Sequence, residues 1–95
     1  MAFRIVSTLK EYEVRAVRTG VSRSTSQPWM QLVVEHPDTA DQLTLSVPKD
    51  MRRDVESLSL RKGDIVNVSI LAVAQDDGNN YCQLNAIPEL CYEED

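Results

Sequence analysis

The stretch Gln42–Ala74, QLTLSVPKDMRRDVESLSLRKGDIVNVSILAVA, changes its hydrophobic period twice and decides the fold. Residues 42–47 alternate apolar and polar side chains, which is the period of a half-buried strand, and Pro48 ends that strand. The next apolar residues follow helical spacing; they are Met51, Val55 and Leu58. Residues 65–74 are rich in β-branched side chains, which favour a strand. The stretch therefore predicts a strand, a short helix and a second strand.

The predicted helix has recognisable ends. Asp50 is a suitable N-cap, because its carboxylate can accept hydrogen bonds from the first backbone N–H groups. The basic pair at residues 61–62 suits the C-terminal end, and Gly63 suits the stop that follows. We therefore expect a helix that begins near Asp50, ends before Gly63 and turns its apolar side inward.

Two strands are predicted before this stretch, over residues 12–18 and 29–35, and one after it, over residues 81–87. The residues expected to face inward are Tyr12, Val14, Ala16, Met30, Leu32, Val34, Cys82, Leu84 and Ala86. The alternation slips near Val17, which predicts a bulge. Residues 22–28 are polar and bend-prone and predict an exposed hairpin arm, while Asp76-Asp77-Gly78-Asn79-Asn80 predicts a hairpin turn.

Three strands, a helix and two further strands match the connectivity of an OB-fold, a five-stranded Greek-key barrel. We therefore expect an all-β protein with one OB-fold domain over residues 1–88 and an acidic C-terminal tail over residues 89–95. A chain of 95 residues has room for one domain. The helix would close one end of the barrel. An SH3-like barrel is the main alternative.

Composition excludes several other classes of protein. Hydrophobic residues make up 42% of the chain and charged residues 26%, which is ordinary for a folded domain. The longest mostly apolar run, residues 65–74, is too short to span a membrane, and the N-terminus lacks the pattern of a signal peptide, so we expect a cytoplasmic protein. With two cysteines, no CxxC and one histidine, we expect free thiols and no zinc site.

No motif for catalysis is present in the sequence. There is no GxSxG, HExxH, GxxxxGK[ST] or GxGxxG, and three glycines are too few for a phosphate cradle. Asp76 and Asp77 lie beside Gly-Asn and are interpreted as turn residues, as is His36 before Pro37. We expect a binding protein rather than an enzyme, with no catalytic residue, metal or cofactor.

Charge is unevenly distributed along the chain. The net charge is −5, but residues 1–34 carry +3 and residues 35–95 carry −8. A local positive field can attract an anionic partner even when the whole chain is acidic. The basic part includes Arg15, Arg18 and Arg23, close in sequence to the only tryptophan, Trp29.

Cations beside an exposed aromatic ring are what single-stranded nucleic acid requires, because phosphates pair with cations and unpaired bases stack on rings. If Met30, Leu32 and Val34 face the core, then Trp29, Gln31 and Val33 face outward; the alternative for Trp29 is packing over the barrel rim as part of the core. Tyr81 has the same two alternatives on the last predicted strand, and it faces outward if Cys82 and Leu84 face inward. The candidate nucleic-acid-binding residues are Arg15, Arg18, Arg23, Trp29, Gln31 and Tyr81.

The run Arg18-Thr19-Gly20-Val21-Ser22-Arg23, followed after four residues by Pro28-Trp29, resembles the DNA-binding wing of the single-stranded-DNA-binding (gene V) proteins of filamentous phages. A relative encoded on a plasmid or integrative element would fit equally well. The resemblance implies an OB-fold, a homodimer, phosphate contacts from Arg18 and Arg23, and base stacking on Trp29 in place of a tyrosine. The sequence differs in having Gln27 where the family has a basic residue.

The expected nucleic acid is single-stranded DNA, with RNA as the alternative. Two further partners are expected, a second copy of the chain and a replication protein. Residues 65–74 are apolar on both sides of the strand, which is explained either by a homodimer interface that includes Leu71 or by coverage from the helix. The end Glu93-Glu94-Asp95 resembles the acidic tips through which bacterial single-stranded-DNA-binding proteins recruit replication proteins; the alternative is a solubilising tail. The alternative function is an OB- or SH3-like protein-interaction module in a replication or conjugation assembly.

Overall fold

The chain folds around six strands and one short helical segment, and the computed structural model describes residues 3–76, 78 and 80–91. The elements are β1 (Phe3–Val21), β2 (Pro28–Glu35), β3 (Gln42–Ser46), the 3-10 turn η1 (Lys49–Met51), α1 (Arg52–Ser57), β4 (Ile65–Ala74), β5 (Asn80–Leu84) and β6 (Glu89–Leu90). Within this part of the chain, no helix is long and apolar enough to cross a membrane.

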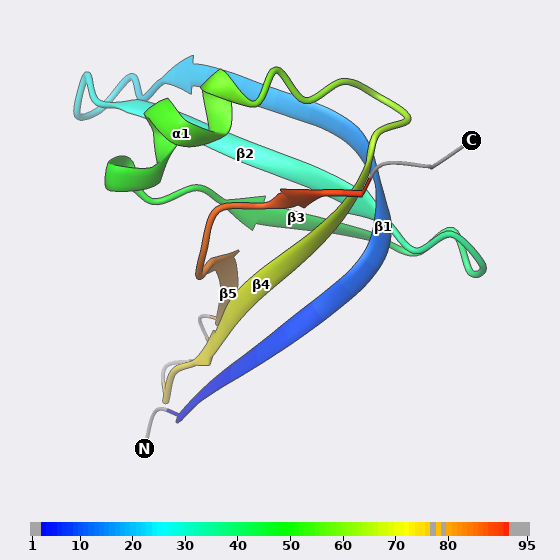
Figure 1. The fold of residues 1–95 in the computed structure, drawn as a ribbon. Coiled ribbons are helices and arrows are strands. Elements are labelled where there is room, and N and C mark those ends of the chain that lie inside the picture. Colours follow the sequence, from blue (N-terminus) through cyan, green and yellow to red (C-terminus); the bar gives the residue numbers. More distant parts are fainter. Residues whose placement is uncertain (1–2, 77, 79, 92–95) are drawn as a thin grey trace.

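The sheet closes on itself. Its strand order is β1-β2-β3-β5-β4, and β4 pairs again with β1. The β3–β5 pair is parallel, whereas the other pairs around the barrel are antiparallel. The helix α1 lies between β3 and β4 in the chain and packs beside the β1–β2 side of the barrel (Figure 1). This is the five-stranded all-β architecture of an OB-type barrel, and the predicted connectivity is confirmed.

Strand β1 is longer than the predicted residues 12–18, because it extends back to Phe3 and forward to Val21. Its first half pairs with β4 and its second half with β2, so one strand forms two sides of the barrel (Figure 1). The register shifts once between Leu9 and Tyr12 and again between Val14 and Ala16. The bulge expected near Val17 therefore lies slightly earlier. Pairing with the distant β4 supplies backbone hydrogen bonds that the local pattern does not reveal.

The core lies inside the barrel, and every buried side chain in the described part of the chain is apolar. The most deeply buried side chains are Val14, Leu32, Val34, Leu45, Val55, Val66, Val68 and Leu84. The inward assignment of Met30, Leu32 and Val34 is confirmed. The inward assignment of Ala86 is wrong, because β5 ends at Leu84 and Ala86 is exposed. Val33, expected to face outward, is not part of the core cluster, but it is only 4% exposed because its register neighbours on β1 and β3 flank it on both sides.

The helix is shorter than predicted and begins later. Asp50 lies within η1, whose N-cap is Pro48, and the N-cap of α1 is Met51. Neither N-cap forms a side-chain cap hydrogen bond, so the expected cap at Asp50 is wrong. Val55 is buried in the core as expected. Leu60, after the helix, packs against the core. The predicted stop at Gly63 has a φ of 100°, a backbone conformation that favours glycine.

The last described residues remain part of the sheet. Glu89 and Leu90 pair with β4, and the Cys91 N–H donates to the Ile65 carbonyl at 2.8 Å. Asp77 and Asn79 of the predicted turn and residues 92–95 of the tail lie outside the described residues. Cys82 and Cys91 are free thiols, as expected.

Candidate nucleic-acid interface

The arm, residues 22–28, comprises the connection between β1 and β2 and the first residue of β2, and the predicted hairpin is confirmed. Pairing continues up to Val21 and Pro28. Beyond that pair, the Ser22 N–H donates to the Gln27 carbonyl at 2.9 Å, and the Ser26 N–H donates to the Ser22 carbonyl at 2.8 Å. These bonds hold an exposed turn of small polar residues at the tip.

Two of the predicted cations lie on this hairpin with their side chains open to solvent. Arg23 is exposed in the turn, and Arg18 is exposed on β1 five residues earlier. Within residues 3–76, 78 and 80–91 neither side chain forms an ion pair or a hydrogen bond. Both guanidinium groups are therefore available to an incoming anion.

Arg15 is placed differently. Its Nη1 lies 3.4 Å from Glu13 Oε1 and 3.8 Å from Glu35 Oε2, at the register shift between Val14 and Ala16. The bulge changes the direction of this side chain and brings it against two carboxylates. The structure therefore separates Arg15 from the two arginines with which the sequence grouped it.

The indole of Trp29 lies over the backbone of Gly20, its register partner on β1. A Cβ atom added to Gly20 would be 2.5 Å from Trp29 Cζ2, so the ring occupies the space that a side chain would take. Trp29 as a whole remains 39% exposed. Trp29 is neither part of the core nor free in solvent: the sheet supports it while part of its surface stays accessible.

We use the term outer face for the side of the strands that points away from the core. Register partners across a sheet share a face, so Arg18 and its partner Gln31 lie on the outer face with Trp29. Trp29 is two residues before Gln31, which places it diagonally from Arg18 at about 7–8 Å between backbones. A cation, an amide and an aromatic ring are thus adjacent on one surface.

Tyr81 lies farther around the barrel on β5 and is 42% exposed. It pairs with Val73 on β4, which in turn pairs with Arg4 on β1. Register partners share a face, so all three lie on the outer face, where Val73 is only 4% exposed between its two neighbours. Arg4 is an exposed cation that the sequence reading did not select, because nothing in the local pattern indicates that the start of the chain lies beside β4.

Two further outer-face residues were also missed as site residues. Ser46 pairs with Gln31 across β2–β3, and Gln83 pairs with Ser46 across the parallel β3–β5 contact. The alternation of residues 81–87 did indicate an outward Gln83. Only the barrel closure, however, shows that this amide is in register with Gln31.

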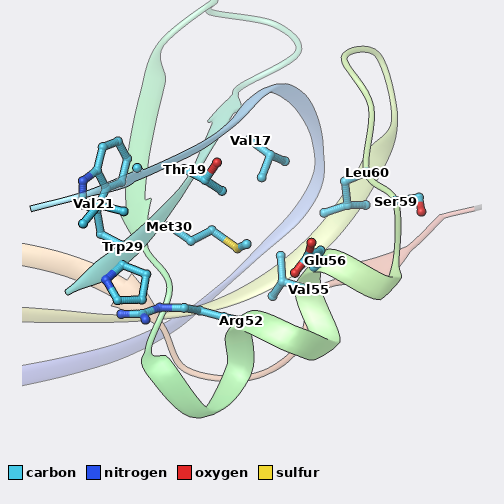
Figure 2. A pocket seen from close by; sticks show the side chains of 12 residues that line it. Val17, Thr19, Val21, Trp29, Met30, Arg52, Val55, Glu56, Ser59 and Leu60 are labelled. Atoms are coloured by element: carbon cyan, nitrogen blue, oxygen red, sulfur yellow. The ribbon is translucent and has the colours of Figure 1, made fainter. Parts of the chain in front are cut away.

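A groove with a volume of about 450 Å³ lies between the β1–β2 hairpin and α1, and Gly20 and Trp29 are among the residues that line it. Figure 2 shows Val17, Thr19, Val21 and Met30 along the sheet and Arg52, Val55, Glu56 and Leu60 along the helical segment. The Nε atom of Arg52 is buried and has no hydrogen-bond partner in the described part of the chain. The groove is mainly apolar, with a single buried donor that lacks an acceptor.

Comparisons of this chain with protein-family models, with curated proteins and with solved structures gave no match. The assignment of the site therefore depends on the geometry of its own residues.

Proposed function

We propose that the protein is a sequence-tolerant, non-enzymatic single-stranded-DNA-binding protein that protects or organises DNA during replication or DNA transfer. The observation that carries the proposal is Trp29, which is 39% exposed and rests on Gly20, beside Arg18, which has no partner among the described residues. In OB-folds the face of strands 2 and 3 and the adjoining loops commonly bind oligonucleotides. Trp29 stands on β2 of that face.

The division of roles follows from chemistry. A base stacked on an aromatic ring contributes about 1–3 kcal/mol regardless of its identity, which gives tolerance of sequence. Arg18 and Arg23 would neutralise phosphates on either side of the stacked base, since both are exposed and unpaired in the described residues. The overall charge of −5 opposes DNA binding at long range, so we expect weaker affinity than in a basic protein.

The direct test is a titration of intrinsic tryptophan fluorescence with oligo-dT at low salt. Because Trp29 is the only tryptophan, any change of emission reports on this site. We expect quenching that saturates, together with retardation of the oligonucleotide in a native gel. An unchanged spectrum with no retardation would contradict the proposal.

A homodimer is part of the same proposal. Residues 3–9 of β1 pair with β4 along one edge, whereas β2 pairs only with residues 13–21, so within the described chain the other edge of residues 3–9 has no strand partner. Ile5 and Val6 on this segment are 53% and 61% exposed. Leu71, the expected interface residue, is half-buried between Val6 and Gln83. An open apolar edge favours pairing with a second copy.

The groove under the hairpin supports a second candidate function, a protein-interaction module. An apolar cleft of about 450 Å³ with the unsatisfied Arg52 Nε suits an apolar peptide that carries a carboxylate. The oligo-dT titration separates the two functions, because a peptide-binding module would leave the fluorescence and the gel unchanged on adding DNA.

A further inference from the structure

Four outer-face side chains form one continuous row across the barrel. Arg18 on β1 pairs with Gln31 on β2, Gln31 with Ser46 on β3, and Ser46 with Gln83 on β5. We call Arg18, Gln31, Ser46 and Gln83 the polar row. It crosses from the hairpin to the last strand of the barrel without an apolar residue between.

The polar row is neutral beyond Arg18, and its hydrogen-bonding groups are unused. Gln31 and Gln83 are half-buried, and no side chain of the row forms a hydrogen bond within the part of the chain that the structure describes. A glutamine amide offers two donors and one acceptor, and a serine hydroxyl offers both. Such groups match the edges of unpaired bases, whereas they provide no charge for phosphates.

An aromatic ring stands on each side of the polar row. Trp29 is two residues before Gln31, and Tyr81 is two residues before Gln83. Because β2 is antiparallel to β3 and β3 is parallel to β5, β2 and β5 run in opposite directions. Trp29 and Tyr81 therefore flank the row on opposite sides. Along the sheet surface they are separated by two strand spacings and about four residues, roughly 16 Å, which is room for several stacked nucleotides.

We infer that a single DNA strand crosses the outer face from Trp29 to Tyr81 and that the polar row hydrogen-bonds the edges of the bases between them. This inference rests on the proposed function. Arg4, which shares a row with Val73 and Tyr81, contacts a phosphate at the far end. The site thus combines salt-dependent contacts at its ends with salt-independent base recognition at its centre.

The experiment measures binding of fluorescently labelled oligo-dT, oligo-dA and an abasic oligonucleotide of equal length at several salt concentrations. Gln31→Ala and Gln83→Ala each remove one amide of the row. Ser46→Ala removes the hydroxyl of the row at an exposed position, so it disturbs neither half-buried glutamine. Gln75→Ala is the matched control, because Gln75 is exposed beyond the end of β4. Thermal unfolding establishes that each variant is folded.

We expect Gln31→Ala and Gln83→Ala to lower affinity about 2- to 10-fold on at least one base-bearing strand, as the loss of one neutral hydrogen bond predicts. Neither should change affinity for the abasic strand or the slope of affinity against salt. Arg4→Gln should instead flatten that slope by about 0.7 log units per log unit of salt, and Gln75→Ala should change nothing.

The failure of this inference is distinguishable from that of the proposed function. If the wild type binds oligo-dT while the glutamine and serine variants match it on every base-bearing strand, the inference is overturned and the proposed function stands. An equal loss on abasic and base-bearing strands also overturns base recognition by the row. If the wild type binds no strand at all, the proposed function fails and the inference fails with it.

Discussion

Trp29 and Gly20 form a cross-strand pair in which the indole takes the place of the missing side chain: a Cβ atom on Gly20 would lie 2.5 Å from Cζ2 and 2.7 Å from Cε2 of the ring. A glycine in a strand interior normally weakens the sheet, and an aromatic partner that covers it compensates. The arrangement also fixes the ring on the outer face, because the indole rests on the backbone beneath it. The glycine therefore determines where the exposed aromatic surface lies.

The first prediction concerns this pair. Gly20→Ala should displace the indole, because 2.5 Å is far too short for two carbon atoms, while the backbone at Gly20 has no positive φ that would exclude alanine. We expect a shift in tryptophan emission without ligand, weaker binding of oligo-dT, and a loss of about 1–3 kcal/mol in the free energy of unfolding. Thr8→Ala, an exposed position on the half of β1 that pairs with β4, is the control and should leave the emission unchanged. An unshifted spectrum in Gly20→Ala would show that the ring does not rest on this residue.

The second prediction separates stacking from mere burial of Trp29. Trp29→Ala should lower affinity for oligo-dT by about 1–3 kcal/mol, the contribution of one stacked base. Trp29→Phe keeps a ring over Gly20 and should retain most of the affinity. Anisotropy of a labelled oligonucleotide measures both variants. Equal losses in the two variants, each with an unchanged unfolding temperature, would contradict a stacking role.

The third prediction uses the different surroundings of the arginines. Arg18→Gln and Arg23→Gln should each weaken binding to all sequences alike and flatten the dependence on salt by about 0.7 log units per log unit of salt. Arg15→Gln should change the slope far less, because its guanidinium group is already paired with Glu13 and Glu35. The measurement is affinity over a series of salt concentrations. A double variant at Arg18 and Arg23 with the wild-type slope would exclude the hairpin as the phosphate-binding element.

The fourth prediction concerns assembly. Val6→Glu places a charge on the open edge of β1 and should convert a dimer into a monomer of 10.7 kDa, as measured by light scattering at micromolar concentration. Val21→Glu is a matched control, because Val21 is 63% exposed at the arm, away from that edge. A wild-type protein that is already monomeric, or a Val6→Glu variant that remains dimeric, would place no interface at this edge.

The sequence by itself determined the elements whose pattern is local. Residues 28–35, 42–46 and 65–74 form strands close to the predicted bounds. The first two were predicted from the alternation of their side chains, and residues 65–74 were predicted from their β-branched side chains. The change of period after Pro48 predicted the helix, and the strand order predicted the OB-type barrel. Trp29 was expected on the outer face for the same reason of alternation, and it lies there.

Tertiary structure alone decided what depends on partners distant in the chain. Residues 3–9 of β1 become a strand because β4 supplies their hydrogen bonds, and only that pairing brings Arg4 into line with Tyr81. Val33 is buried by neighbours on both sides, and the bulge turns Arg15 toward two carboxylates. The alternation of side chains along one strand predicts neither of these features. The single parallel contact of Ser46 with Gln83 likewise aligns the polar row, since register between strands is set by closure of the barrel rather than by either strand's own sequence.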